Sequence, residues 1–314
     1  MAQGGLMDEP LEPVVTDAFW LILTPSVDHQ GWLEAARTAA NLAGWLLISE
    51  HEDGAVDDGR LRLIVTDDAQ HALAAGAGRI AAIVAEPESA PSAVAELHGL
   101  VAPESNWHAS VLLARALSLA PDHRVVTAAE LAARPREIVL FDALKLTPPV
   151  SRAEYSKDPM LAAAFKLYRD VAADQHDVIQ WAEPLFSYCP KGSRDAASQG
   201  MLDITGRPRM LVHGPYLSMP TGLWRACIRF GVDQEAAKHQ YRLDWGTRTA
   251  TISEYVTPGK AGLYELSLDF DWTDVDVAEI RLILLEGSFT GALLFQGITV
   301  SRTVASEEPV RTAA

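Results

Sequence analysis

Two different hydrophobic periods divide the chain. Up to about residue 150, short runs that are almost continuously apolar alternate with alanine-rich stretches of helical spacing. The apolar runs are 18–24, 44–49, 61–67, 79–86, 123–127 and 137–142, and the helical stretches are 32–41, 69–75, 92–98, 107–119 and 128–133. Strands that are apolar throughout and separated by helices predict a parallel sheet covered on both faces. We therefore expect a small Rossmann-like α/β domain over residues 17–150.

From about residue 201 the period becomes two. In the segment LYELSLDFDW, one side of the chain carries only large apolar residues, namely Tyr264, Leu266, Leu268, Phe270 and Trp272. The segment WRACIRFGV alternates in the same way. About seven such segments follow one another with glycine and proline turns between them. This pattern predicts an antiparallel β-sandwich, with a jelly-roll-like arrangement, over residues 199–302.

A proline-bearing segment, LTPPVSRAEYSKDP, separates the two patterns. Asp158 can cap a helix whose first residue is Pro159, where proline is tolerated. Apolar residues then recur at helical spacing, and the helix can continue to Trp181. We expect a helical connector over residues 151–198 that docks on a domain through its aromatic side. Residues 1–16 are expected to be a flexible leader and residues 303–314 a disordered tail.

Charge and cysteine content narrow the function classes. The 314 residues carry a net charge of −16, and residues 1–150 hold 21 acidic against 9 basic side chains. Such a surface repels phosphate backbones and anionic lipid, so we expect neither nucleic-acid binding nor membrane binding. Cys189 and Cys227 lack metal-ligand spacing and are expected to be free thiols of a reducing compartment. No secretion signal or membrane-spanning run is visible, which predicts a cytoplasmic location, and we expect no metal or cofactor.

Polar residues at the carboxyl ends of the parallel strands are the candidates for an enzymatic site. Asp67, Asp68 and Asp142 could bind a nucleotide-sugar, with Mg²⁺ held by the carboxylates. The sequence TDDAQ is also a good helix N-cap, so a structural role for these aspartates is the competing interpretation. Gly76–Ala81 matches the letters of a dinucleotide fingerprint. That segment follows a helix and opens a strand, which excludes the fingerprint.

Two other polar segments have structural explanations. In SNWH, a capping role for Ser105 or Asn106 is expected in place of a catalytic role for His108. The segment DFDWTDVDV offers four carboxylates for calcium, Asp269, Asp271, Asp274 and Asp276. The first two lie on the outer face of a predicted strand, whereas calcium needs six or more oxygens from a bent loop.

The segment HGPYLSMPTGLWRACIRFGVD joins a Gly-Pro-Tyr sequence, a proline-glycine turn and an aromatic strand. Together with DITGRPR, AGLYELSLDF and FQGITVSR, it resembles a β-sandwich module of uncharacterised, sphingomonad-type alphaproteobacterial proteins associated with surface polysaccharides. The resemblance covers roughly residues 202–302. It implies a carbohydrate-binding-like sandwich and brings no catalytic residues with it.

Three functions are compatible with these patterns. The leading hypothesis is a non-catalytic or accessory protein of surface-polysaccharide biology, whose sandwich binds glycan or a protein partner. Aromatic rings near turns can stack on sugar faces, so we expect Tyr216 and Trp245 in the binding site, with His213 as a hydrogen-bonding group. The alternatives are a glycosyltransferase-like enzyme that uses the aspartates of the α/β domain, and a structural assembly protein. The oligomeric state stays open.

Overall fold

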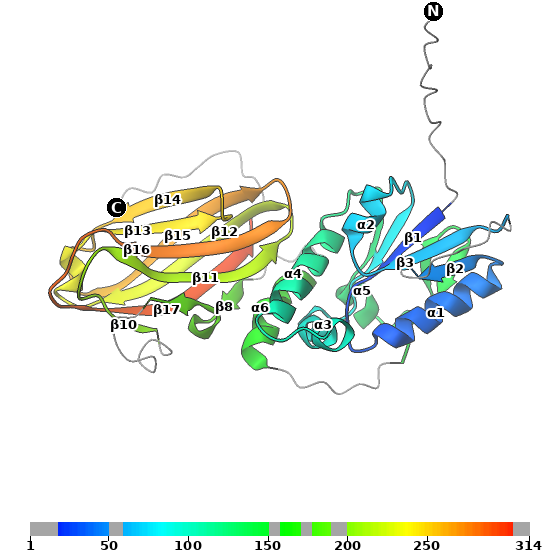
Figure 1. Cartoon of the computed structure of the whole chain (residues 1–314), viewed down its shortest axis with the longest axis horizontal. Coiled ribbons are helices and arrows are strands. Elements are labelled where there is room, and N and C mark those ends of the chain that lie inside the picture. Colours follow the sequence, from blue (N-terminus) through cyan, green and yellow to red (C-terminus); the bar gives the residue numbers. More distant parts are fainter. Residues whose placement is uncertain (1–17, 50–58, 151–157, 171–177, 190–199, 304–314) are drawn as a thin grey trace, which may run out of the picture.

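The computed structural model describes residues 18–49, 59–150, 158–170, 178–189 and 200–303. They form an α/β unit followed by a β-sandwich, and the two units lie side by side (Figure 1). The expected leader, and the expected tail beyond residue 303, lie outside the described residues. Among the described helices, none is long and apolar enough to cross a bilayer.

Five parallel strands form the sheet of the α/β unit. They are β1 (Ala18–Leu23), β2 (Leu46–Ser49), β3 (Arg62–Thr66), β4 (Ile80–Ile83) and β5 (Arg124–Val126). Their order is β2-β3-β1-β4-β5, and every pairing is parallel, which confirms the predicted type of sheet. The Rossmann order is 3-2-1-4-5. This sheet exchanges the two strands at one edge, so it has the predicted layers without the Rossmann strand order.

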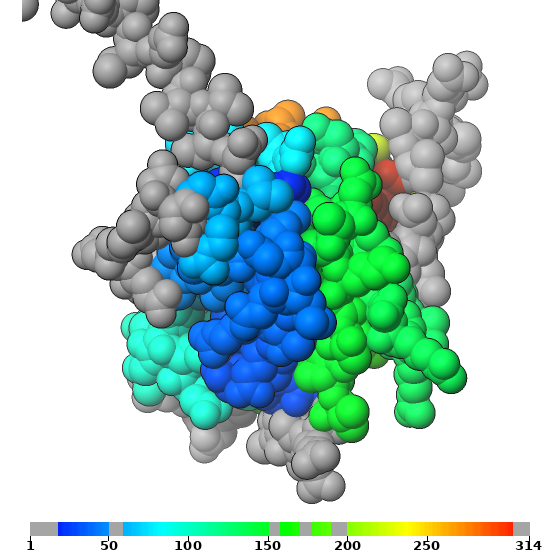
Figure 2. Space-filling view, turned by 90° about the vertical axis from the view of Figure 1, so that its right-hand side faces the viewer, coloured from blue at the N-terminus to red at the C-terminus, as the bar shows by residue number. Residues whose placement is uncertain are grey.

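Helices cover both faces of this sheet, because the central strands are apolar on both sides. On one face, α1 (His29–Leu42) packs through Trp32 and Ala36. Figure 2 views the molecule from the end formed by the α/β unit, and α1 is seen there in blue. The other face is covered by α2 (Ala69–Ala74), α3 (Ala90–His98) and α4 (Glu104–Leu117). The short α5 (Ala128–Ala132) follows β5.

The sixth predicted strand does not join the parallel sheet. β6 (Ile138–Phe141) pairs with β7 (Leu144–Leu146) as an antiparallel hairpin, and β7 packs against α1. Asp142 lies in the turn of this hairpin and is exposed. It therefore does not end a parallel strand, which was the premise of its predicted role.

The sandwich consists of two five-stranded sheets whose pairings are antiparallel. One sheet has the order β10-β17-β12-β15, with β8 also paired to β17, and the other has the order β14-β13-β16-β11-β9. The strands are β8 (Ile179–Trp181), β9 (Ser187–Tyr188), β10 (Met201–Asp203), β11 (Arg209–Met219), β12 (Gly222–Val232), β13 (Tyr241–Gly246), β14 (Thr251–Val256), β15 (Gly262–Trp272), β16 (Asp276–Leu284) and β17 (Ala292–Arg302). The predicted β-sandwich is confirmed, and its jelly-roll character stays a prediction.

Among the described residues of the connector, the α-helix is confined to α6 (Pro159–Asp170), and a short 3-10 turn follows at Glu183–Leu185. α6 begins where predicted, and Asp158 Oδ1 accepts hydrogen bonds from the backbone N–H groups of Met160 and Leu161 at 2.9 and 3.3 Å. The predicted extension of this helix to Trp181 is wrong, because Trp181 belongs to β8. The apolar spacing that indicated a helix there serves instead to bury Ile179 and Trp181 in the sandwich.

The two units share one hydrophobic core and a polar seam. Buried residues of α4 and α6 belong to the same apolar cluster as the interior of the sandwich, so the interface is an extension of that interior. Within the seam, the Tyr168 hydroxyl donates to the Ser218 carbonyl at 2.8 Å, and the Ser218 N–H donates to Ser110 Oγ at 3.0 Å. The Thr221 N–H donates to Ser118 Oγ, also at 3.0 Å. These bonds fix β11 and the turn that follows it against α4.

Candidate functional site

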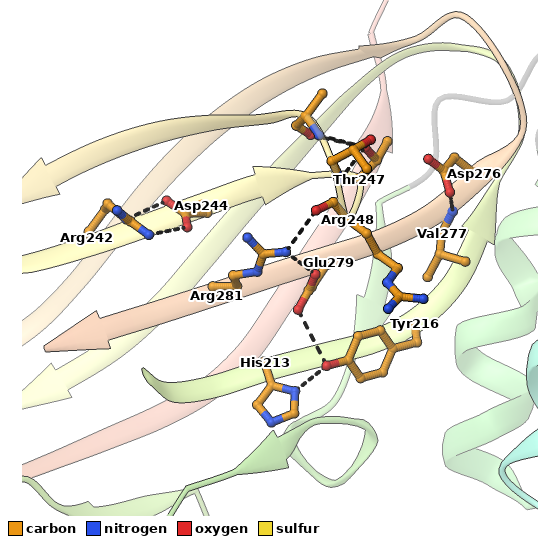
Figure 3. A network of polar contacts seen from close by, with 12 residues as sticks. His213, Tyr216, Arg242, Asp244, Thr247, Arg248, Asp276, Val277, Glu279 and Arg281 are labelled. Carbon is orange, nitrogen blue, oxygen red and sulfur yellow. Dashed lines mark hydrogen bonds and ion pairs between the residues drawn. The ribbon is translucent and has the colours of Figure 1, made fainter. Parts of the chain in front are cut away.

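An irregularity in β11 determines where the Tyr216 ring lies. The register of β11 against β16 shifts between Pro215 and Ser218, as it does at a β-bulge. Tyr216 lies inside this shift with φ of 65°, a left-handed conformation that costs a non-glycine residue about 1–2 kcal/mol. Bulges re-aim side chains. Here the phenol extends over the outer face of the sheet toward His213 and Glu279 (Figure 3).

The outer face of this sheet presents a row of charged and polar side chains. In β16 the apolar residues Ala278, Ile280, Leu282 and Leu284 are buried in the sandwich interior, so the alternation places Glu279 and Arg281 on the opposite, outer face. The strand register places Arg281 beside Asp244 of β13 on one side and beside His213 of β11 on the other. The row therefore follows directly from the alternation of the strands.

Hydrogen bonds join these side chains into one network (Figure 3). The Tyr216 hydroxyl contacts His213 Nδ1 and donates to Glu279 Oε1 at 3.4 Å. Arg281 Nη2 donates to the other oxygen of Glu279 and, at 3.4 Å, to the backbone carbonyl of Arg248. Glu279 is only 6% exposed, so it is a nearly buried carboxylate whose charge is compensated by Arg281.

Burial sets the protonation of the two rings in this network. It lowers the pKa of His213, against the opposing effect of the Glu279 carboxylate, so His213 is neutral near pH 7. It raises the pKa of Tyr216, and the Glu279 charge raises it further, so the phenol stays protonated. In the tautomer that carries its proton on Nδ1, His213 donates to the Tyr216 oxygen while the Tyr216 hydroxyl donates to Glu279. His213 Nε2 then remains an acceptor for an incoming hydroxyl group.

A groove lies where this sheet meets α4. One hollow of about 600 Å³ is lined by Trp107, Tyr216, Arg248, Val277, Glu279 and Arg281, and we call these six residues the junction groove. A second hollow of about 390 Å³ shares Trp107 and Tyr216 with it and continues along α6 at Met160 and Leu161. Trp107 is 47% exposed. Rings from both units therefore stand in one concave surface.

Trp245 does not belong to this surface, and its predicted role in binding is wrong. The side chain is fully buried, and its ring centroid lies 4.8 Å from that of Trp272 and 6.2 Å from that of Trp181. Its indole N–H donates to the Trp224 carbonyl at 3.3 Å. The reason is the period of β13, in which Tyr241, Leu243 and Trp245 all point inward. Trp224 and Trp272, which stand on the apolar sides of β12 and β15, are buried in the same core.

The aspartates of the α/β unit are held apart in structural roles. Asp68 caps α2 and forms an ion pair with Arg115. Asp67 lies 2.9 Å from His98 Nε2. Asp142 lies in the β6–β7 turn. The structure does not bring the three carboxylates into one site, and the capping interpretation of TDDAQ is confirmed for Asp68.

A different cavity occupies the carboxyl edge of the parallel sheet. It measures about 780 Å³ and is lined by residues that follow β1, β4 and β5, among them Ser26, Glu86 and Ala128. Arg134 and Arg169 also line it. Ser26 Oγ is buried there and has no hydrogen-bond partner among the described residues. Open α/β sheets bind ligands at this edge, so a ligand of this unit would use the cavity and not the three aspartates.

The remaining sequence candidates have other roles. α4 begins at Glu104, with Pro103 in the cap position, so neither Ser105 nor Asn106 caps it as predicted. Among the calcium candidates, Asp269 pairs with Arg225, and Asp276 Oδ1 accepts from the Val277 N–H at 2.7 Å. Within the described part of the chain, no group of three or more His, Cys, Asp or Glu side chains is arranged to hold a metal ion.

Of the six residues of the junction groove, the sequence identifies Tyr216 and does not identify the other five, Trp107, Arg248, Val277, Glu279 and Arg281. Glu279 and Arg281 did leave a signal, because they alternate with buried aliphatic residues in EIRLILL and must share the outer face. Arg248 lies in a hairpin turn, where alternation gives no information. Trp107 lies on another unit, and only the packing of α4 against β11 brings it to the groove.

Comparison with known proteins gives weak likenesses only. No family model and no curated protein matches the chain. Among solved structures, a xylan-binding module, CBM15, is 12% identical, with a TM-score of 0.30 and coverage of 41% of this chain and 97% of that one. TmCBM61, solved with β-1,4-galactotriose, is 10% identical, with a TM-score of 0.27 and coverage of 33% and 69%. At such TM-scores these likenesses carry no functional inference, and we base the proposed function on the junction groove itself.

Proposed function

We propose that this chain binds glycan in the junction groove. The observation that carries the proposal is the presence of two rings, the exposed Trp107 of α4 and the half-buried Tyr216 of β11, in one hollow with charged side chains of the sheet. Aromatic faces pack against the apolar faces of sugar rings, while guanidinium, carboxylate and imidazole groups bond to hydroxyl groups. A hollow of about 600 Å³ lies in the usual range for ligand sites.

The groove favours binding over glycoside cleavage. Hydrolysis by the common mechanisms requires two carboxyl groups on either side of the scissile bond. Glu279 is the single carboxylate among the described residues that line this hollow. Its charge is already engaged in an ion pair with Arg281. We therefore propose an accessory role, in the surface-polysaccharide setting that the sequence resemblance suggests. That setting and the cytoplasmic location stay predictions.

The test is isothermal titration calorimetry, in which each member of a panel of oligosaccharides is titrated into the full chain. Trp107→Ala and Tyr216→Ala are each expected to weaken binding by tenfold or more, because each removes one stacking surface. Tyr255→Ala is the matched control, since Tyr255 is 55% exposed on β14 and does not line the groove. Failure of every glycan to bind, or undiminished binding by both groove variants, would overturn the proposal.

The cavity of the α/β unit supports a second candidate function, the binding of a nucleotide-sugar. Its support is the position at the carboxyl edge of the sheet and the exposed guanidinium of Arg134 at its wall. Calorimetry with UDP-glucose tests it, and Arg134→Ala is expected to weaken binding. Arg136→Ala, which changes an exposed arginine outside the cavity lining, is the control. Equal affinities of the wild-type, Arg134→Ala and Arg136→Ala proteins for UDP-glucose would reject this second site.

A further inference from the structure

We infer that the junction groove selects carboxylated sugars, and that Arg248 binds the sugar carboxylate. This inference rests on the proposed glycan binding and names the class of glycan. Three features of the groove lead to it: the rigid turn that carries Arg248, the lack of an acidic partner for its guanidinium, and the place of that guanidinium beside a stacking ring.

The turn between β13 and β14 holds Arg248 in a fixed position. The Thr247 N–H donates to the Ala250 carbonyl at 2.8 Å, and the Ala250 N–H donates back to Thr247 Oγ1 at 3.0 Å. Gly246, with φ of 151°, allows the turn to close, because an added Cβ would lie 2.4 Å from the Ala250 oxygen. The Arg248 carbonyl in turn accepts from Arg281. The backbone of Arg248 is therefore positioned before any ligand arrives.

The guanidinium of Arg248 has no acidic partner among the described residues, and the residue is exposed. The other arginine of the groove, Arg281, is neutralised by Glu279. His213 is neutral near pH 7, as argued above. One positive charge in the groove is thus uncompensated. The chain as a whole carries a net charge of −16, so this positive charge does not come from a generally basic protein.

The position of the charge fits a sugar acid. Figure 3 shows the Arg248 guanidinium next to the Tyr216 ring, and the two groups are near enough for the charge to act on the phenol. A pyranose that stacks on Tyr216 or Trp107 would direct a substituent at its edge toward Arg248. The planar guanidinium fork pairs with a carboxylate through two parallel hydrogen bonds. A uronic acid supplies the face for the ring and the carboxylate for the fork.

The test compares ligands that differ only in charge. Oligogalacturonides and alginate oligomers are titrated against the full chain at low salt, each beside its carboxyl-reduced counterpart. We expect at least one acidic form to bind about tenfold more tightly than its reduced form, as a charge-assisted contact implies. Arg248→Ala should abolish this difference, and Arg248→Glu should reverse it. Arg207→Ala, at an exposed arginine outside the groove, should leave it unchanged.

The outcomes separate this inference from the proposal beneath it. If acidic and reduced forms bind equally and Arg248→Ala changes neither affinity, selection of carboxylates is wrong while glycan binding stands. If a sulfated glycan binds through Arg248 and no uronate does, the inference is also overturned, because the anion is then a sulfate ester. If no oligosaccharide binds, both the inference and the proposed function fail.

Discussion

Replacement of Trp245 by alanine distinguishes a core residue from a binding platform. The ring is fully buried between Trp181 and Trp272, and its N–H bonds to the Trp224 carbonyl. Truncation of a buried tryptophan costs about 3–5 kcal/mol, and the lost hydrogen bond about 0.5–1.5 kcal/mol. We therefore expect Trp245→Ala to lower the free energy of unfolding by about 4 kcal/mol. That is a large part of the roughly 5–15 kcal/mol that stabilises a typical domain.

The assay is urea unfolding followed by far-ultraviolet circular dichroism. With a slope of about 3 kcal/mol per molar urea, the loss corresponds to a fall in the midpoint of more than about 1 M. Trp107→Ala is the matched control, because a side chain that is 47% exposed should cost less than about 1 kcal/mol. A Trp245→Ala protein that unfolds at nearly the wild-type midpoint but has lost glycan binding would refute the assignment of Trp245 to the core.

Three further predictions concern the seam, a buried histidine and a surface ion pair. Ser110→Ala leaves the buried Ser218 N–H without its acceptor, so the free energy of unfolding should fall by about 1–3 kcal/mol in urea titrations. Burial lowers the pKa of His29 in the folded chain from its ordinary value of about 6.5. As the pH falls below about 6.5, His29 therefore takes up a proton in the unfolded chain before it does so in the folded chain. Stability should therefore fall as the pH drops from 7 to 5, and by less in His29→Asn when midpoints are compared at the two pH values. Arg225→Ala breaks an exposed pair with Asp269 and should change the melting temperature by an amount equivalent to less than about 1 kcal/mol.

The spacing of apolar side chains along the sequence predicted the strands and helices, but it did not predict every pairing between strands. The strict alternation of β15 and β12 identified the sandwich, because one face of each strand must be buried. Residues 137–142 show the limit of this reasoning. A short apolar run indicates a strand, yet it does not say whether the strand joins the parallel sheet or, as β6 does, forms a hairpin beside α1. The partner is chosen by tertiary packing.

The candidate site was predictable where it depended on one segment of the chain. His213 and Tyr216 were identified from the Gly-Pro-Tyr sequence, and both line or support the junction groove. Trp245 lies near a turn, which predicts an accessible ring, but the alternation of β13 turns its side chain into the core. Trp107 was out of reach for a physical reason. Its place in the groove depends on the packing of α4 against β11, whose bonded residues Ser110 and Ser218 are 108 positions apart in sequence.

The continuity of the core has a consequence for the role of the α/β unit. α4 supplies Trp107 to one wall of the groove and, one turn later, Ser110 to the seam, where its Oγ accepts the Ser218 N–H and donates to the Trp107 carbonyl at 2.6 Å. The same side chain thus bonds to the backbone of Trp107 and to β11, which carries Tyr216. Separation of the units would remove one wall of the groove and expose the apolar surface that α4 and α6 bury. We conclude that the α/β unit contributes to the proposed glycan site as one of its walls, whether or not its own cavity binds a ligand.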